Sequence, residues 1–433
     1  MYISKIVLKN IRGFEQLEFD LDRGNSTYAG WTVFTGDNGS GKSTLLKAIA
    51  VGLTGKDTSR SLQPSFNRWI REGVGTDEAS IQLDIVRSSD DEVADYGNTS
   101  KKPDFPAKIC LTNGGKETTL QSAIPQGKSK NYATPDRTIW SPNAKGWFSC
   151  GYGPFRRVFG ASFQAARQMV APSTEKFVTM FEKAASLAEV DEWLRKLHHM
   201  TLENKADATV QLDLLLTILR DDLLPNEITV DHVDSGGLWL KDRNGVELAW
   251  PEMSDGYRSA LALLTDIVRH LINAYGVEGL TGTGADGKLY VKRSGVVLID
   301  EIDAHLHPEW QRTIGFWLKK HFPNIQFLVT THSPIICQAA DLNGLFVLPE
   351  PGSHEQPRPL SPEEYWEVIA SRPDTILLSS AFGLQNTRSP RAVESRAVLS
   401  KLQAKKHAGG ALTQEEADLW ARSQPFVATD EEL

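Results

Sequence analysis

The chain has 433 residues and carries 47 lysines and arginines against 55 aspartates and glutamates, a formal net charge of −8. This acidic balance excludes a protein that binds polyanions through its net charge, so any contact with DNA must come from a local basic patch. Hydrophobic residues make up 40% of the chain, enough to fill the cores of two or three lobes and to exclude disorder of the whole chain.

The apolar stretches are short. Val296–Ile299, for example, is far shorter than the roughly 20 residues needed to cross a bilayer, so the chain is predicted not to span a membrane. The cysteines Cys110, Cys150 and Cys337 are scattered and form no CxxC pair, which suits a reducing compartment. Because charge also interrupts the apolar run at the amino terminus, we expect a cytoplasmic protein.

The first predicted elements are short β-rich runs at residues 2–9 and 15–21, with a turn at Gly13 between them. A third run, Trp31–Thr35, leads directly into a glycine-rich turn and then a helix predicted from about residue 42 to residue 53. A strand, a glycine loop and a helix in this order are typical of an α/β domain.

Later segments change character several times. Short β runs continue to about residue 153, and residues 174–223 have helical patterning. Near-continuous apolar runs at 296–299 and 325–330 predict parallel strands covered on both faces. The predicted organisation is an α/β head in two parts, with a helical lobe between them and a C-terminal helical extension after them. Its boundaries are 1–173, 174–225, 226–360 and 361–433.

The first candidate site is Gly36-Asp37-Asn38-Gly39-Ser40-Gly41-Lys42-Ser43, which fits the G-x-x-x-x-G-K-[ST] phosphate loop between a strand and a helix. The glycines let backbone amides point at phosphate oxygens, and the helix N-terminus adds the positive end of its dipole. Lys42 is expected to reach the β- and γ-phosphates, and Ser43 to ligate Mg²⁺. The predicted nucleotide contacts are Gly36, Asn38, Gly39, Ser40, Gly41, Lys42, Ser43 and Thr44.

A second candidate site follows the apolar run 296–299, where Asp300 and Glu301 come at the end of a predicted buried strand. Carboxylates at the carboxyl end of such a strand lie beside a bound nucleotide. Asp300 is expected to hold Mg²⁺, and Glu301 to orient and deprotonate the attacking water. Together, the two motifs predict hydrolysis of a nucleoside triphosphate.

The segment Met253-Ser254-Asp255-Gly256-Tyr257-Arg258-Ser259 precedes an apolar helix and resembles the short signature motif of the SMC, RecF and OLD-like ATPases. Ser254 is expected to cap that helix, whose amide end can meet a γ-phosphate bound by another subunit. The resemblance implies nucleotide contacts for Ser254 and Gly256, a D-loop role for Asp303 and a switch role for His332 in Thr330-Thr331-His332-Ser333-Pro334.

The opening Lys9-Asn10-Ile11-Arg12-Gly13-Phe14 also resembles the start of SMC and RecF heads, which makes Arg12 a candidate contact to phosphate or DNA. The glutamine that senses the metal in this group is not identifiable by context, and Gln164 and Gln168 are both candidates. His305 and His307 are expected to be structural rather than a metal pair. Arg156, Arg157 and Arg167 form a basic segment that could touch nucleotide or DNA, although most such arginines belong to a solvated face.

The resemblance therefore implies an ABC-type P-loop ATPase head, with ATP and Mg²⁺ as cofactors. The implied group is the OLD/RecF-related ATPases of bacterial anti-phage defence systems, such as Septu, retron-associated Septu-like modules and PARIS. It further implies heads that dimerise, or assemble into higher oligomers, around ATP and control an effector nuclease of HNH or TOPRIM type. Two alternatives stay open: a RecF- or SMC-like DNA-repair ATPase that binds DNA itself, and a nucleotide-dependent scaffold with little turnover.

Overall fold

The computed structural model describes residues 1–73, 75–89, 91, 104–123, 134–141, 145–156, 158, 172–183, 185–350 and 355–426. The chain divides into two compact units, residues 1–371 and residues 372–433. None of the helices described in these ranges is both long enough and apolar enough to cross a membrane.

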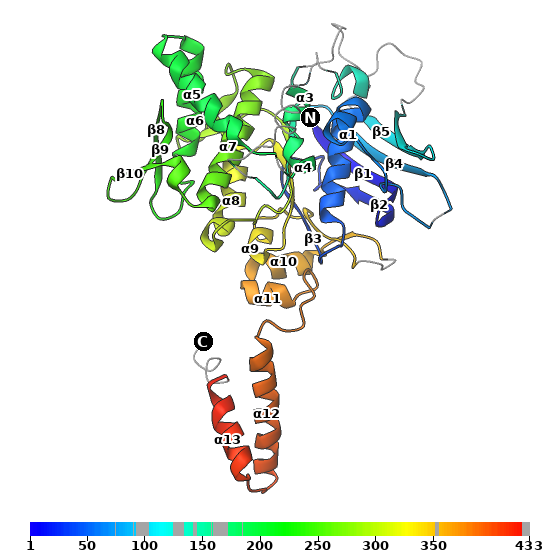
Figure 1. Ribbon diagram of the computed structural model, residues 1–433, viewed down its shortest axis with the longest axis vertical. Coiled ribbons are helices and arrows are strands. Elements are labelled where there is room, and N and C mark those ends of the chain that lie inside the picture. Colours follow the sequence, from blue (N-terminus) through cyan, green and yellow to red (C-terminus); the bar gives the residue numbers. More distant parts are fainter. Residues whose placement is uncertain are drawn as a thin grey trace. The chain divides into compact units, whose positions relative to one another are not determined.

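A six-stranded sheet forms the centre of the first unit (Figure 1). Its order is β16-β15-β3-β14-β13-β7, and all neighbours pair in parallel except β15 and β16. Every residue of β3, β13 and β14 is buried, as the near-continuous apolar runs predict. The strands are β3 (Gly30–Thr35), β7 (Ser149–Tyr152), β13 (Gly295–Ile299), β14 (Ile325–Thr330), β15 (Leu345–Val347) and β16 (Arg358–Pro359).

Helices cover both faces of this sheet. Figure 1 shows α1 (Lys42–Leu62) on one side, and α7 (Asp255–Tyr275) and α8 (Pro308–His321) on the other. The alternation of side chains along β3 explains the arrangement, because Phe34 joins the core that contains α1, whereas Trp31 lies against Gly315 of α8. The short α9 (Pro334–Cys337) follows β14.

A five-stranded antiparallel sheet packs on the outer side of α1, in the order β2-β1-β4-β5-β6. Buried and solvent-facing residues alternate along β4 and β5, so one face of the sheet joins the core. Gly52 of α1 approaches this sheet closely, since a Cβ there would lie 2.6 Å from the Leu83 side chain. The strands are β1 (Tyr2–Ile11), β2 (Phe14–Asp20), β4 (Glu78–Val86), β5 (Asp104–Asn113) and β6 (Thr118–Ser122).

Between β7 and α7 the chain forms the helical lobe that the sequence predicts, followed by a small antiparallel sheet that it does not. The helices are α3 (Pro172–Glu175), α4 (Val178–Phe181), α5 (Ala188–Leu202) and α6 (Ala206–Leu219). The sheet has the order β10-β9-β8, from β8 (Thr229–Asp234), β9 (Gly237–Lys241) and β10 (Glu247–Ala249). A further pair, β11 (Thr281–Thr283) and β12 (Leu289–Val291), precedes β13.

The C-terminal helices are distributed over both units. Helix α10 (Pro362–Ala370) belongs to the first unit, where Tyr365 donates a hydrogen bond to the Ala340 carbonyl over 3.0 Å and Val368 is fully buried. The second unit contains α11 (Pro373–Leu378), α12 (Pro390–His407) and α13 (Gln414–Ser423). Capping boxes at Ser361 and Thr413 begin α10 and α13.

Candidate active site

The strand order brings the predicted site residues to one edge of the central sheet. The phosphate loop follows β3, His332 follows β14, and Asp300 and Glu301 follow β13. These three strands are adjacent and parallel, so their carboxyl ends meet at the same edge. Residues that are up to 296 positions apart in sequence, such as Gly36 and His332, therefore lie at the same edge because of the topology of the sheet.

Three glycines shape the phosphate loop. Gly36, Gly39 and Gly41 have φ values of 144°, 85° and 96°, which side chains with a Cβ rarely adopt. Gly41 also has no room for a Cβ, because one would lie 2.4 Å from the ring of Phe14 on β2. Phe14 of the antiparallel sheet thus packs against the phosphate loop at Gly41, the N-cap residue of α1.

Lys42 is 6% exposed and folds over the loop, donating hydrogen bonds to the carbonyls of Gly36 (2.7 Å) and Asp37 (2.8 Å). Burial lowers the pKa of its ammonium group, whereas the nearby carboxylates of Asp300 and Glu301 act in the opposite direction. The Lys42 charge thus lies on the phosphate loop, near the acidic residues that follow β13.

Asp300 is 1% exposed, and its carboxylate accepts a hydrogen bond from the Thr330 hydroxyl over 2.6 Å. The same hydroxyl oxygen accepts the Glu301 amide hydrogen over 2.8 Å. Glu301 has a φ of 47°, a left-handed conformation that is costly for a residue with a Cβ. Thr330, which the sequence analysis did not single out, therefore helps to fix both acidic residues.

Residues 300–306, named here the acidic turn, are tied to the segment after β14. Asp303 accepts a hydrogen bond from the Thr331 hydroxyl. Gln311 of α8 donates to the Leu306 carbonyl over 2.8 Å and accepts from the Ser333 hydroxyl over 2.6 Å. Between these anchored neighbours, the His332 side chain is exposed. His307 caps α8 by accepting the Glu309 amide over 3.3 Å, which agrees with its expected structural role.

Arg156 departs from the expectation of a solvated face, because only 3% of it is exposed. Its guanidinium group donates to the carbonyls of Asp300 (2.8 Å) and Glu301 (2.9 Å). Sequence reasoning missed this role because the carbonyls that bury Arg156 come from a segment more than 140 residues away. Arg157, Arg167, Gln164 and Gln168 lie outside the described residues.

Ser254 occupies the N-cap position of α7, as predicted, but its side chain makes no capping hydrogen bond and is exposed. Gly256 packs against the acidic turn, where a Cβ would lie 2.5 Å from the His305 carbonyl oxygen. Figure 1 shows α7 and α1 on opposite sides of the central sheet. The Ser254 hydroxyl thus faces solvent at a helix end distinct from the one that follows the phosphate loop.

Arg12 lies beside the first turn of α1. Its guanidinium group is 3.5 Å from the Thr44 hydroxyl and stacks over the Trp69 ring at 4.7 Å. Burial lowers the pKa of this guanidinium group. Arg12 was a candidate contact to phosphate or to DNA. Its position beside Thr44 lies next to the phosphate loop.

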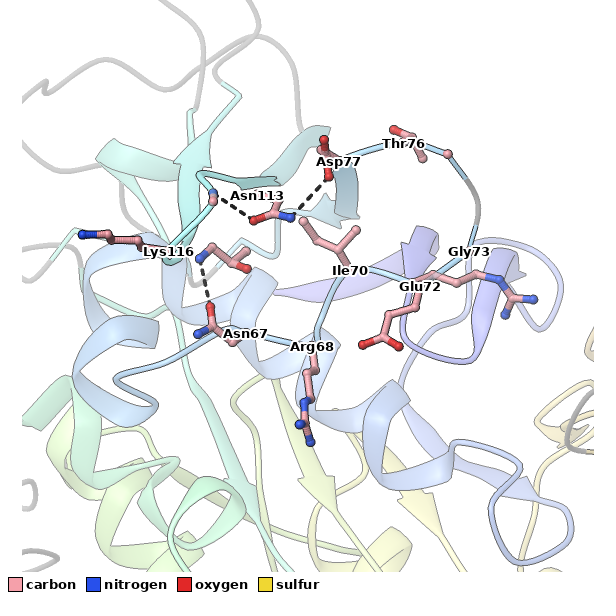
Figure 2. Close-up of a pocket in the computed structure, with 13 residues that line it drawn as sticks. Asn67, Arg68, Ile70, Glu72, Gly73, Thr76, Asp77, Asn113 and Lys116 are labelled. Atoms are coloured by element: carbon pink, nitrogen blue, oxygen red, sulfur yellow. Dashed lines mark hydrogen bonds between the residues drawn. The ribbon is translucent and has the colours of Figure 1, made fainter.

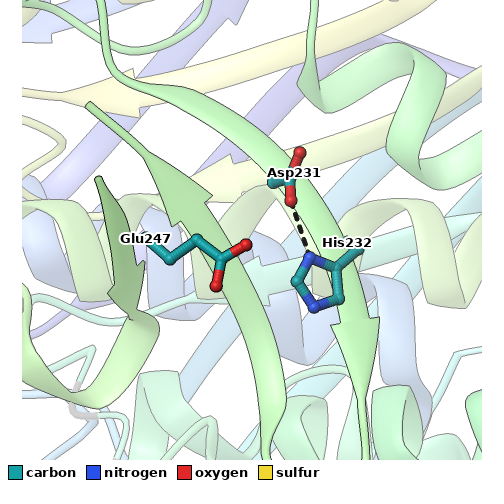
Figure 3. A group of neighbouring side chains, drawn as sticks. All are labelled: Asp231, His232 and Glu247. Atoms are coloured by element: carbon teal, nitrogen blue, oxygen red, sulfur yellow. Dashed lines mark hydrogen bonds and ion pairs between the residues drawn. The ribbon is translucent and has the colours of Figure 1, made fainter. Parts of the chain in front are cut away.

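Among the described residues, Asp231, His232 and Glu247 form a group that could hold a metal ion (Figure 3). A register shift in β8 between Val230 and His232 accompanies the approach of the first two side chains, whose atoms are 2.7 Å apart. The Lys241 ammonium group already lies 3.0 Å from Asp231 and 3.9 Å from Glu247. A cation would have to displace this lysine, so we read the group as an ion-pair network.

A hollow of about 570 Å³ lies on the antiparallel sheet, between the loop after α1 and the β5–β6 turn. Figure 2 shows the charged side chains of Arg68, Glu72 and Lys116 diverging from one another rather than pointing at a common centre. The bonds drawn there, such as the one from the Thr118 amide to Asn67, hold the loops together. Among the described residues that line this hollow, no set of side chains converges on a point where a ligand would bind.

Residues 31–338 match the family model AAA_21, described as "AAA domain, putative AbiEii toxin, Type IV TA system". The matched span begins in β3 and ends just after α9. It includes the phosphate loop, the helical lobe, the acidic turn and residues 253–259, named here the signature turn.

Two curated relatives are each 27% identical to the chain. One is the Septu protein PtuA of Bacillus mycoides strain KBAB4, with 77% of this chain and 38% of the relative aligned. The other is the "Retron Ec83 probable ATPase" of Escherichia coli, with 80% of this chain and 71% of the relative aligned. The chain thus spans well under half of the Septu protein's length. A solved SMC head bound to the C-winged helix domain of ScpA is 16% identical, with a TM-score of 0.49 over 84% of this chain and 99% of that one.

Proposed function

The chain belongs to this family of AAA domains, and on that premise we propose that it binds ATP with Mg²⁺, hydrolyses it between two associated heads, and thereby controls an effector nuclease in defence against bacteriophage. The observation that carries the proposal is the placement of the phosphate loop, the acidic pair and His332 on adjacent parallel strands. The relatives named as Septu and retron proteins support the defence role.

The residues of one head have distinct roles in this reaction. Backbone amides of the phosphate loop and Lys42 bind the β- and γ-phosphates, and Arg12 and Thr44 lie beside them. The Ser43 hydroxyl and the Asp300 carboxylate would hold Mg²⁺, which neutralises charge on the phosphate oxygens. Both are hard oxygen donors of the kind that this ion prefers. Glu301 orients the attacking water and accepts its proton.

A second head completes the site in this proposal. Ser254 and Gly256 lie at the N-terminus of the 21-residue helix α7, whose free amides and positive dipole end favour an anion. The Ser254 hydroxyl is exposed and makes no capping bond within its own chain, so it is available to a γ-phosphate held by a partner. His332, exposed just after β14, senses the same phosphate. Asp303, in the acidic turn, would lie at the interface between the two heads.

A complementation experiment tests the composite site. Lys42→Ala and Ser254→Arg each remove one half of every site, so each purified variant should be inactive. A heterodimer of the two contains one intact site, so an equal mixture should recover at most about a quarter of wild-type ATPase activity. Replacing the Ser254→Arg chain with the double variant Lys42→Ala/Ser254→Arg leaves no intact site and is the matched control. A mixture as inactive as this control refutes the shared site.

The effector proposal needs a separate experiment. Full-length chain expressed with the nuclease encoded beside it should co-purify with that nuclease, and nuclease activity should change when ATP is hydrolysed. If the purified chain instead binds DNA by itself in a salt-sensitive way and retains no nuclease, a direct role in DNA repair replaces the defence role. If ATP is hydrolysed no faster than in buffer, even with nuclease and DNA present, the chain acts as a nucleotide-dependent scaffold rather than as an ATPase.

A further inference from the structure

Arg156 makes an unusual set of contacts for a buried cation. Besides the carbonyls of Asp300 and Glu301, its guanidinium group reaches the Gly153 carbonyl at 3.1 Å and those of Ile302 and Ala304 at 3.4 Å. A guanidinium group offers five N–H donors in a rigid plane, which suits several carbonyls converging on one point. The acidic turn is therefore wrapped around this single side chain.

The acidic turn has a specific need for such a partner. Its first residues leave the strand in a tight turn, in which Glu301 has positive φ and the Ala304 amide bonds back to the Glu301 carbonyl. The turn therefore directs several carbonyls inward, and a buried carbonyl without a hydrogen bond is costly. Arg156 supplies those hydrogen bonds, and one of them goes to the carbonyl of Glu301, the residue proposed to activate water.

Arg156 also reaches the signature turn through its own backbone. Its carbonyl accepts a hydrogen bond from the Ser259 hydroxyl over 3.0 Å, and Ser259 is 6% exposed in the second turn of α7. The Gly256 backbone lies against the His305 carbonyl on the same side. One residue thus joins the turn that bears Glu301 to the helix that begins at Ser254.

The charge of Arg156 suits this position. Burial lowers its pKa to about 10, while Asp300, Asp303 and Glu301 favour the charged form. The group therefore remains a cation at neutral pH and offsets part of the negative charge that gathers on the acidic turn. A neutral side chain of similar size would leave this negative charge without compensation.

We propose that Arg156 is a positioning residue that holds Glu301 and Asp303 in place and couples them to the Ser254 end of α7. The inference rests on the proposed function, in which the acidic turn serves one ATP and Ser254 serves the ATP of the partner. Arg156 therefore links the two ATP sites of a dimer through the interior of each head. Its guanidinium group contacts backbone carbonyls of its own head, so in this proposal it acts through Glu301 and Asp303.

Two variants of the full chain test this role. In Arg156→Lys, a shorter ammonium group with three donors cannot span the acidic turn. We expect ATP affinity within about threefold of wild type and kcat lower by about tenfold or more, since positioning acts on the chemical step. Amide hydrogen exchange in residues 300–306 should become about tenfold faster, while exchange in β3 and the phosphate loop stays unchanged.

In Ser259→Ala, only the link to the signature turn is lost. We expect exchange in residues 254–260 to quicken and kcat to fall about threefold or more, with ATP affinity retained. Thr265→Val is the matched control, because Thr265 is buried in the same helix and its hydroxyl has no hydrogen-bond partner among the described residues. This control should resemble wild type in all three measurements.

Several outcomes would overturn the proposal. A folded Arg156→Lys chain with wild-type kcat and wild-type exchange in residues 300–306 would contradict the positioning role of Arg156. A parallel loss of ATP affinity and kcat would indicate a role in ATP binding instead. If Arg156→Lys does not fold, Ser259→Ala behaving like Thr265→Val overturns the coupling. If the wild-type chain hydrolyses no ATP, the proposed function fails. The exchange measurement would still test whether Arg156 holds the acidic turn in place.

Discussion

Thr330 donates its hydroxyl hydrogen to the buried carboxylate of Asp300 over 2.6 Å. The same oxygen accepts the amide hydrogen of the next residue, Glu301, over 2.8 Å. A single hydroxyl at the end of β14 therefore orients the two acidic residues at the end of the neighbouring strand.

Removing this hydroxyl should affect hydrolysis more than nucleotide binding. In Thr330→Val, which has the same shape, Asp300 loses a hydrogen bond and the Glu301 amide is left unpaired, so we expect kcat to fall about 10- to 100-fold and more Mg²⁺ to be required. Steady-state ATPase rates against Mg²⁺ concentration measure both effects. Thr330→Ser keeps the hydroxyl and should recover most activity, and an equally impaired serine variant would contradict this role.

Glu301→Gln should separate ATP binding from hydrolysis. The amide cannot accept a proton from water, but Lys42 and the phosphate loop are unchanged, so we expect ATP affinity close to wild type and kcat lower by about 100-fold or more. Because ATP persists, the variant should accumulate as a closed dimer, measured by light scattering after size exclusion with and without MgATP. An unchanged mass in the presence of ATP would count against dimerisation through bound nucleotide.

A methyl group at Gly256 should disturb the contact between the signature turn and the acidic turn. In Gly256→Ala the Cβ would lie 2.5 Å from a backbone oxygen of His305, so one of the two segments must move. We expect kcat to fall by about tenfold while ATP affinity changes little. Gly13→Ala, where a Cβ meets nothing within 4 Å, is the matched control, and equal losses in both variants would contradict the packing argument.

The pH dependence of stability should contain a contribution from Glu189. Burial, together with the hydrogen bond and charge of Glu175, raises the pKa of Glu189 to about 7, although Arg269 lies 3.9 Å away. The folded chain keeps a proton that the unfolded chain releases near pH 4.5, so this group lowers the free energy of unfolding as pH rises from about 4.5 to about 7.

Glu189→Gln removes this titration. Allowing for solvent screening of a half-buried group, the stability of Glu189→Gln relative to wild type should be about 1–2 kcal/mol more favourable at pH 8 than at pH 5. Urea unfolding at the two pH values measures the difference, with Glu192→Gln at an exposed position of α5 as the control. A relative stability independent of pH would show that Glu189 is ionised in the folded chain throughout this range.

Truncation should distinguish α10 from the helices that follow it. A chain ending at Ser371 keeps Tyr365 and Val368 in the first unit and should retain its melting temperature and ATPase rate. A chain ending at Leu360 loses both anchors, and we expect it to be about 2–4 kcal/mol less stable, as for removal of large buried side chains. Equal stability of the two truncated chains would show that α10 contributes little to the first unit.

The sequence predicted the segments that meet at the candidate site because their signals are local. The phosphate loop, the buried strand before Asp300 and the strand before His332 each combine an apolar run with a recognisable polar sequence, and the α/β order predicted a parallel sheet. The sheet topology then places these groups at one edge. That result follows from general rules for parallel strands rather than from any single residue.

The supporting residues could not be predicted in the same way. Arg156 reads as one of several surface arginines until the acidic turn closes around it, and Thr330 reads as an ordinary strand residue. Their roles depend on contacts across more than 25 positions in sequence, for which a single sequence holds no signal. The sheet β8–β10 was missed because its strands have only 6, 5 and 3 residues, too few for a clear alternation of polar and apolar side chains.

The strand order has one more consequence. β14 separates β3 from β13, so the segment proposed to bind the phosphates and the segment proposed to bear the base are two strand spacings apart, about 10 Å by the ordinary repeat of a sheet. Hydrogen bonds between the main chains of neighbouring strands set this distance, and it does not depend on the side chains along the edge. Substitutions of the side chains that line this edge should therefore leave the distance between the two segments unchanged.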